Sequence, residues 1–139
     1  MAGTGKTATV LASIKSLIIE ARNKLIPDFS FVEINCLRIS SASEAYTLLW
    51  RALSGEFLSS KKAEIQLAAF FRQRCEAYER NDDPERKHII CLMDELDFLI
   101  TKDEEVIYNF FTWSLRAGKG ILLLGVSNIM DLPERLSNR

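Results

Sequence analysis

The residues near the start of the chain have the types and the spacing that phosphate binding requires. Lys6 carries a charge that can lie between two phosphate groups, and the hydroxyl of Thr7 can coordinate Mg²⁺. Gly3 and Gly5 allow the backbone to turn tightly and to point N–H groups at phosphate oxygens. A helix that begins near Lys6 would add the positive end of its dipole. The sequence therefore predicts a phosphate-binding segment that comprises Ala2, Gly3, Thr4, Gly5, Lys6, Thr7 and Ala8.

Two acids follow a continuous apolar run at residues 88–93. Such a pair cannot lie in a core without partners. We predict that Asp94 holds Mg²⁺ through its water shell, together with the Thr7 hydroxyl, and that Glu95 orients and polarises an attacking water. The alternative is an exposed strand end whose acids cap the following segment.

A polar amide follows the next apolar run, at residues 121–126. The side chain of Asn128 can form hydrogen bonds with both a γ-phosphate and the attacking water, or it can belong to a turn. Together with the first two segments, the amide of Asn128 predicts a site for ATP and Mg²⁺ in which Glu95 and Asn128 are catalytic. For Asp97 two interpretations stay open: it supports this site, or it caps a helix that begins near Asp103.

Composition limits the other classes of function. The chain has 139 residues, 47% hydrophobic and 27% charged, with a net charge of −1, which is typical of one globular domain and gives no support for a broad basic surface. A single histidine, His88, leaves no hydrolytic triad and no histidine–cysteine metal site. We expect Cys36, Cys75 and Cys91 to be buried thiols. No apolar run is long enough for a membrane span.

Periodicity predicts alternating helices and strands, and hence a parallel α/β sheet. Helices are expected at residues 6–25, 40–53, 61–80 and 103–115, and strands at 29–35, 88–93 and 121–126, the last two buried on both faces. Pro27 should end the first helix, Ser41 or Ser43 should cap the second, and Gly55 should end it. The first helix should have one apolar face, made of Val10, Ile14, Leu17, Ile18 and Ala21.

Several motifs together resemble the AAA+ segment of the family formed by eukaryotic origin recognition complex subunit 1 and cell division cycle 6. They are GTGKT at residues 3–7, FVEIN at 31–35, MDELD at 93–97 and SNIMDLPERL at 127–136, with YNFFTW at 108–113 as a further similarity. The stretch at 127–136 is the most specific. The motifs at 94–97 and 130–133 favour a resemblance to subunit 1.

The resemblance implies a P-loop NTPase fold of the AAA+ type, a parallel sheet with flanking helices. It implies an ATP-binding subunit that marks replication origins in the nucleus and helps to load the replicative helicase, with ATP shared between sister subunits. The implied partners are other origin recognition complex subunits, origin DNA through the full-length protein, and the helicase-loading machinery. No membrane is implied.

We expect residues 1–139 to form a partial AAA+ domain. One residue, Met1, precedes the predicted phosphate-binding segment, so the first glycine and first strand of the motif, and the lid domain, are not in this sequence. The strand ending at Val126 should then have an unpaired edge and an exposed apolar surface. We therefore predict that these residues alone are poorly stable and inactive.

Three other functions compete with a slow ATPase. A non-hydrolysing module would bind ATP only to hold an assembly together. A helicase is compatible with the DELD sequence at 94–97, but such helicases usually carry Ser-Ala-Thr on the next strand, where this chain has Val126, Ser127 and Asn128. A GTPase is disfavoured because the sequence has no Asn-Lys-x-Asp motif.

Overall fold

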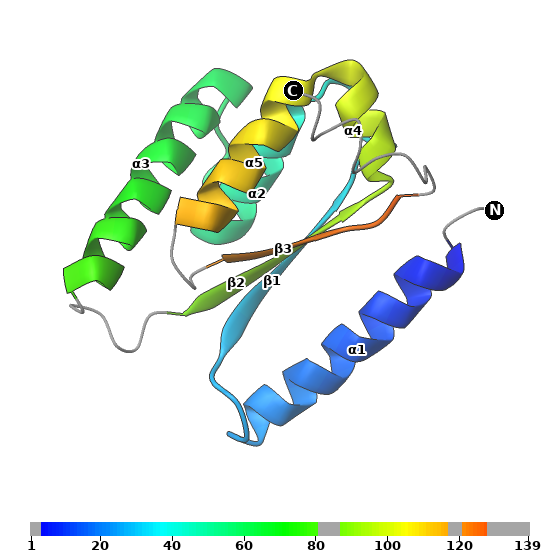
Figure 1. The fold of residues 1–139 in the computed structure, drawn as a ribbon, viewed down its shortest axis with the longest axis vertical. Coiled ribbons are helices and arrows are strands. Elements are labelled where there is room, and N and C mark those ends of the chain that lie inside the picture. The colour runs from blue at the N-terminus through cyan, green and yellow to red at the C-terminus, as the bar shows by residue number, and fades with distance from the viewer. Residues whose placement is uncertain (1–3, 81–86, 117–120, 128–139) are drawn as a thin grey trace.

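The chain folds into a parallel sheet with helices on both faces (Figure 1). The computed structural model describes residues 4–80, 87–116 and 121–127. In chain order the elements are α1 (Thr4–Arg22), β1 (Phe29–Asn35), α2 (Glu44–Ser54), α3 (Ser60–Arg80), β2 (His88–Asp94), α4 (Leu96–Lys102), α5 (Glu104–Arg116) and β3 (Ile121–Gly125).

The three strands are parallel, as the sequence predicts, and they follow the order β1-β2-β3. The register places Asn35 of β1 opposite Asp94 of β2, and Met93 of β2 opposite Gly125 of β3. Since the strands run the same way, their carboxyl ends meet at one edge of the sheet, where ligands of open α/β sheets bind.

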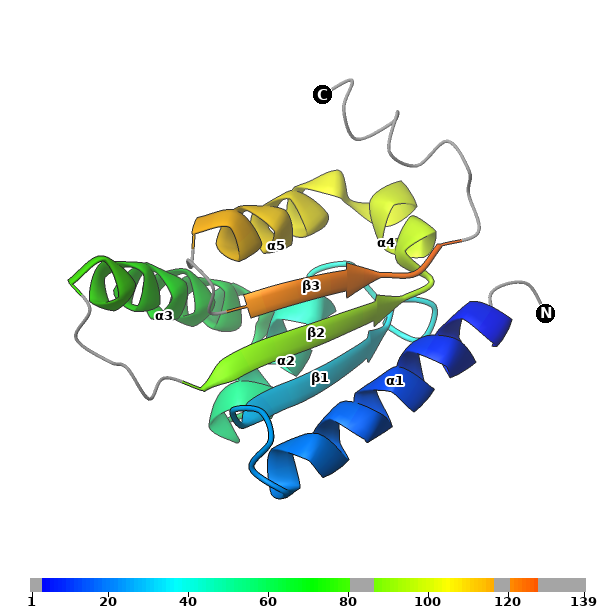
Figure 2. The ribbon, with the colours of Figure 1, turned by 60° about the horizontal axis from the view of Figure 1, so that its bottom comes forward.

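Helices cover the two faces unequally. The long helix α1 lies on one face, and α2, α3 and α5 lie on the other (Figure 2). Alternation along β2 follows this arrangement, because Cys91 and Met93 belong to the main core cluster whereas the buried Leu92 does not. Leu92 therefore faces the side of α1, whose buried residue is Ile14.

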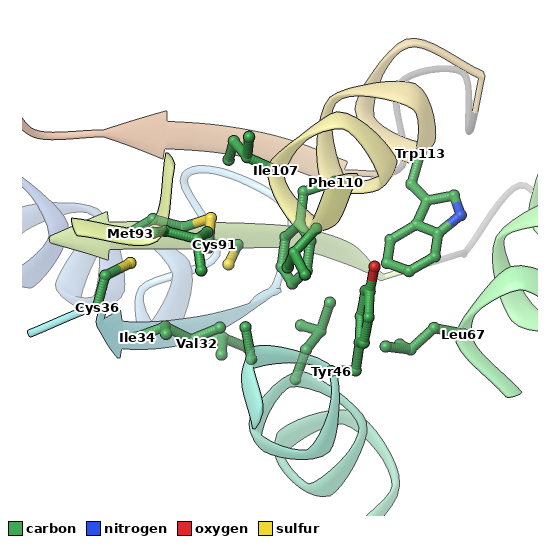
Figure 3. Packing of buried hydrophobic residues seen from close by; sticks show 14 of the residues in the cluster. Val32, Ile34, Cys36, Tyr46, Leu67, Cys91, Met93, Ile107, Phe110 and Trp113 are labelled. Carbon is green, nitrogen blue, oxygen red and sulfur yellow. The ribbon is translucent and has the colours of Figure 1, made fainter. Parts of the chain in front are cut away.

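Aromatic side chains fill the core between α2, α3 and α5 (Figure 3). The Tyr46 ring stacks on Phe110 with centroids 5.9 Å apart, and Phe71 stacks on Trp113 at 5.3 Å. Asn109 Nδ2 donates a hydrogen bond of 2.8 Å to the Tyr46 hydroxyl, so this buried polar group is satisfied. The helices α2, α3 and α5 are thus held together by aromatic packing and by polar contacts such as this one.

Cys36 and Cys91 are fully buried, as expected, but Cys75 is only half-buried, because it lies on a partly exposed face of α3. All three cysteines are free thiols. Burial raises the pKa of Cys36 and of Cys91 to about 12, which keeps both thiols protonated at neutral pH.

The helix α4 is absent from the sequence-based prediction. It has seven residues, too few to show a clear helical period, and it buries Leu96, Leu99 and Ile100. The following helix begins at Glu104, after Asp103. Asp103 Oδ1 accepts a hydrogen bond of 2.9 Å from the Glu105 N–H, so Asp103 caps this helix.

Other predicted boundaries move by a few residues. Helix α1 ends at Arg22, ahead of Pro27, and Lys24 takes a positive φ of 61° just beyond it. Of the five residues predicted to form its apolar face, Ile14 is buried and the other four are half-buried, so the predicted face is a partly covered one.

The ends of α2 follow the prediction in part. Gly55 ends α2 in a left-handed conformation at φ 78°, as predicted. At the other end Ser43 occupies the cap position but makes no side-chain cap hydrogen bond; instead Glu44 accepts from the Ser40 N–H at 2.7 Å.

The expectation that β3 is buried on both faces is wrong. Ile121 is buried, but Leu122 is 52% exposed and Leu123 is half-buried. The reason is the position of β3 at an edge of the described sheet. The separate expectation of an apolar surface at this edge therefore describes the strand correctly.

None of the helices within the described ranges combines the length and apolar character needed to cross a membrane.

Candidate functional site

The candidate site lies where the carboxyl ends of β2 and β3 meet the first turn of α1. Its best-defined contact joins two residues that are 87 positions apart: Thr7 Oγ1 donates a hydrogen bond of 2.9 Å to Asp94 Oδ1. Asp94 is 9% exposed. Two hard oxygen groups, a hydroxyl and a carboxylate, are thus held side by side, which is the donor chemistry that Mg²⁺ prefers.

The lysine of the phosphate-binding segment reaches the same edge of the sheet. Lys6 Nζ donates a hydrogen bond of 3.2 Å to the carbonyl oxygen of Ser127, the residue that precedes Asn128. Lys6 is itself exposed. The three segments singled out in the sequence therefore converge, with Thr7 beside the acidic pair and Lys6 beside the end of β3.

Glu95 adopts a conformation that is uncommon for a residue other than glycine, with φ 57° and ψ 47°. Left-handed geometry costs about 1–2 kcal/mol for an L-residue. Its N–H donates to Asp94 Oδ1 at 2.9 Å, and its carbonyl oxygen accepts from the Phe98 N–H at 3.1 Å. These two bonds hold the sharp turn from β2 into α4, and they bring the Glu95 backbone directly against the carboxylate of Asp94.

The ends of β2 and β3 are joined by backbone hydrogen bonds. The Leu96 N–H donates to the Val126 carbonyl at 2.9 Å, and the Val126 N–H donates to the Met93 carbonyl at 3.0 Å. Close packing accompanies them, because a Cβ on Gly125 would lie only 2.6 Å from Cδ2 of Leu96. A glycine at position 125 thus lets the start of α4 lie against β3.

Asp97 is linked to the site, since its Oδ1 accepts a hydrogen bond of 3.3 Å from the Ser127 hydroxyl. It lies in the first turn of α4. The interpretation of Asp97 as the cap of the helix near Asp103 is wrong, because Asp103 itself supplies that cap. Of the two interpretations, support of the site is the one that the geometry favours.

Carboxylates gather around one buried thiol. After burial, the largest causes that raise the pKa of Cys36 are the charges of Asp94 and Asp97, and Glu95 contributes in the same direction; the charge of Lys102 lowers it. The Cys36 N–H also donates to the Asp94 carbonyl oxygen at 2.9 Å. Cys36 directly follows β1, so a neutral, buried residue and its backbone hydrogen bond connect the end of β1 to the acidic segment.

Some predicted site residues adopt a different structure from the expected one. The predicted tight turn at Gly5 is not what the structure contains: Gly5 lies in the first turn of α1, and its carbonyl oxygen accepts a hydrogen bond of 2.8 Å from Thr9 Oγ1. Glycine permits either geometry, and the helical one satisfies this carbonyl. Ala8 is exposed on the same helix, one residue beyond Thr7.

Other predicted site residues cannot be placed. Ala2, Gly3 and Asn128 lie outside the described residues, and Thr4 is described only as the first residue of α1.

Sequence reasoning missed Ser127 and Gly125. Their sequence signal was weak, since a small residue at the end of an apolar run is common. The useful sign was their position, directly before Asn128 at the end of the third segment. Assuming a parallel sheet would have placed them at its carboxyl edge, although their contacts with α4 could not have been foreseen.

Comparisons with known proteins agree with the geometry. Residues 1–139 match the family described as ATPase family associated with various cellular activities (AAA). One chain in the solved "Structure of Drosophila ORC bound to DNA" is similar with a TM-score of 0.83 and 34% identity, over 96% of this chain and 32% of that one. These matches confirm the predicted fold class.

Two similar curated proteins are each named as subunit 1 of an origin complex. Origin recognition complex subunit 1 of Schizosaccharomyces pombe is 43% identical over 138 residues, which are 99% of this chain and 18% of that protein. Origin of replication complex subunit 1A of Arabidopsis thaliana is 36% identical over 137 residues, 99% of this chain and 16% of that protein. The resemblance to subunit 1 is thereby confirmed, and this chain spans only a small part of each relative's length.

Proposed function

We propose that residues 1–139 form part of an AAA+ domain that binds ATP with Mg²⁺ and hydrolyses it slowly. The proposal starts from the finding that the chain belongs to the AAA family of ATPases. We further propose that the protein acts as a subunit of the origin recognition complex in the nucleus, where it marks replication origins and takes part in helicase loading.

One observation carries the ATP-binding proposal: the hydrogen bond of 2.9 Å between Thr7 Oγ1 and Asp94 Oδ1. In an ordinary α/β domain, nothing requires a hydroxyl at the start of a helix to contact an acid at the end of a buried strand. Here they meet at the sheet edge where ligands bind. The residues fit a nucleotide with its metal, because they combine two hard oxygen donors with a lysine and a helix N-terminus.

Each proposed role follows from the chemistry of the side chain. Residues 2–8 surround the phosphates with N–H groups, and Lys6 neutralises their charge. Thr7 and Asp94 hold Mg²⁺, which when bound neutralises charge on the phosphate oxygens. Glu95 orients and polarises water for attack, and Asn128 contacts the γ-phosphate and that water.

The wider biological role rests on the relatives. Both similar curated proteins are named as subunit 1 of the origin complex, and the similar solved structure is that of Drosophila ORC bound to DNA. We therefore propose sister subunits as partners, and origin DNA and the helicase-loading machinery as partners of the full-length protein. A cell division cycle 6-type role is the alternative.

A double-mutant cycle tests the proposed metal pair in the full-length protein. Mg²⁺ should tighten ATP binding in the wild type, and Thr7→Val and Asp94→Asn should each reduce that Mg²⁺-dependent gain by about tenfold. The double variant should lose no more than the stronger single variant, because both residues act on one ion. Thr7→Ser, which keeps the hydroxyl, is the matched control and should retain the gain. An equal Mg²⁺ effect in all variants would contradict the assignment.

A non-hydrolysing assembly module is the second candidate. The presence of both acids, Asp94 and Glu95, together with Asn128 favours hydrolysis over this candidate, because positioning Mg²⁺ alone does not require all three side chains. The two functions differ in what they require of Glu95, because hydrolysis depends on its carboxylate and simple nucleotide binding does not.

A further inference from the structure

We infer that Asp97 is a positioning residue of the nucleotide site, which holds Ser127, at the end of β3, beside the acidic pair Asp94 and Glu95. This inference rests on the proposed function. It assigns a specific role to Asp97, for which the sequence left two interpretations open.

The contact that carries the inference is a hydrogen bond between two half-buried side chains. Ser127 Oγ donates to Asp97 Oδ1 at 3.3 Å across 30 residues of sequence. Since Asn128 follows Ser127 directly in the chain, whatever holds Ser127 limits where the amide of Asn128 can lie.

Two backbone hydrogen bonds join the carboxyl ends of β2 and β3. The side-chain bond between Ser127 and Asp97 acts at a different residue from both. The bonds Leu96 N–H to Val126 carbonyl and Val126 N–H to Met93 carbonyl stop at Val126. The bond from Ser127 to Asp97 extends the connection by one residue, to the position next to Asn128.

Ser127 also connects the acidic segment with the phosphate-binding segment. Its carbonyl oxygen accepts from Lys6 Nζ at 3.2 Å while its hydroxyl donates to Asp97. One residue therefore contacts groups from two of the three functional segments. A change at the Asp97 contact should alter the alignment of these segments more than it alters the capture of nucleotide, because Thr7 keeps its bond to Asp94 and Lys6 bonds the backbone carbonyl of Ser127, which no substitution at Asp97 or Ser127 removes.

A purely structural role for Asp97 makes a different prediction. An acid in the first turn of a helix also stabilises the helix through its dipole. Loss of that effect would lower the thermal stability and leave the catalytic step of the folded enzyme unchanged. The ratio of kcat to ATP affinity separates the two roles.

The test is steady-state ATP hydrolysis and equilibrium ATP binding in the full-length protein, with Asp97→Ala, Ser127→Ala and the double variant. Each single variant should lower kcat by about three- to tenfold while the Kd for ATP stays within about twofold. The double variant should be no slower than the slower single variant. Ser127→Thr keeps the hydroxyl and should retain the rate, and Asp97→Asn keeps an oxygen acceptor and should lose less than Asp97→Ala.

Each other outcome overturns the inference in a recognisable way. If the wild type hydrolyses ATP and the single variants match its kcat, Asp97 is not a positioning residue, although the proposed function stands. Additive losses in the double variant, or a loss confined to thermal stability, would also overturn the inference alone. A wild type that neither binds nor hydrolyses ATP would overturn the proposed function and this inference together.

Discussion

At the scale of single residues, the site is organised around Asp94. This carboxylate accepts hydrogen bonds of 2.9 Å from the Thr7 hydroxyl and from the Glu95 N–H, while it remains almost fully buried. A buried acid held in this way is oriented before any ligand arrives, and preorganised groups act without reorganisation at the moment of reaction. The strained backbone of Glu95 follows from the same arrangement.

Glu95→Gln distinguishes hydrolysis from simple nucleotide binding. The amide keeps the size and the hydrogen-bonding oxygen of the side chain but polarises water far less. We expect kcat for ATP hydrolysis to fall by about a hundredfold or more, while the Kd for Mg·ATP changes little.

The same variant should prolong the ATP-bound assembly, because turnover would no longer reset it. Dissociation of the subunit complex in the presence of ATP measures this lifetime. Glu105→Gln changes an exposed acid on α5 in the same way and serves as the control. If Glu95→Gln changes neither turnover nor lifetime, the non-hydrolysing module is the correct function.

At the scale of elements, the site exists because parallel strands end together. The apolar run before the acidic pair predicted β2, and the register with β3 then had to bring the third segment to the same edge. That much could be predicted from the sequence. The sources of that prediction are the continuous apolar run of a buried strand and the helical period of apolar residues in long helices such as α3.

The elements that could not be predicted are those whose cause is tertiary. Helix α4 is too short to show a period, and its existence depends on burial of Leu96, Leu99 and Ile100. The contact between Gly125 and Leu96 requires knowledge of which strands are neighbours. Similarly, exposure of Leu122 follows from the place of β3 in the sheet and not from its apolar sequence.

The close approach of β3 to α4 gives a prediction for position 125. Gly125→Val should destabilise the fold by about 1–3 kcal/mol, because its side chain would overlap Leu96 and force the core to shift. Gly125→Ala should cost less, since the nearest atom is the end of a leucine side chain that can turn away. Chemical unfolding of both variants measures these costs. Equal stability of the valine variant and the wild type would show that α4 does not depend on this contact.

At the scale of the whole molecule, the described sheet has a partly exposed apolar edge. Leu122 on β3 and Leu115 on α5 are 52% and 83% exposed. On the other face of the sheet, Ile14 is the one fully buried side chain among residues 5–22 of α1. A sheet with an uncovered apolar edge is prone to associate and gains less free energy from burial than a covered one.

Thermal unfolding of the 139-residue chain tests whether the exposed apolar edge leaves the fold poorly stable. We predict no cooperative transition above about 45 °C, the lower limit for ordinary mesophile domains. Circular dichroism across a temperature ramp, at low protein concentration to limit association, is the measurement. A sharp transition at a higher temperature would contradict the prediction and would show that the described core is sufficient.

The most direct test of the central claim is the affinity of the full-length protein for Mg·ATP, measured beside Lys6→Ala and Lys15→Ala. Lys15 is an exposed lysine on the same helix and controls for a general loss of positive charge. We predict that Lys6→Ala weakens binding by at least about tenfold and that Lys15→Ala leaves it unchanged. Equal affinity of all three proteins, or no binding by the wild type, would contradict the assignment of this site to ATP.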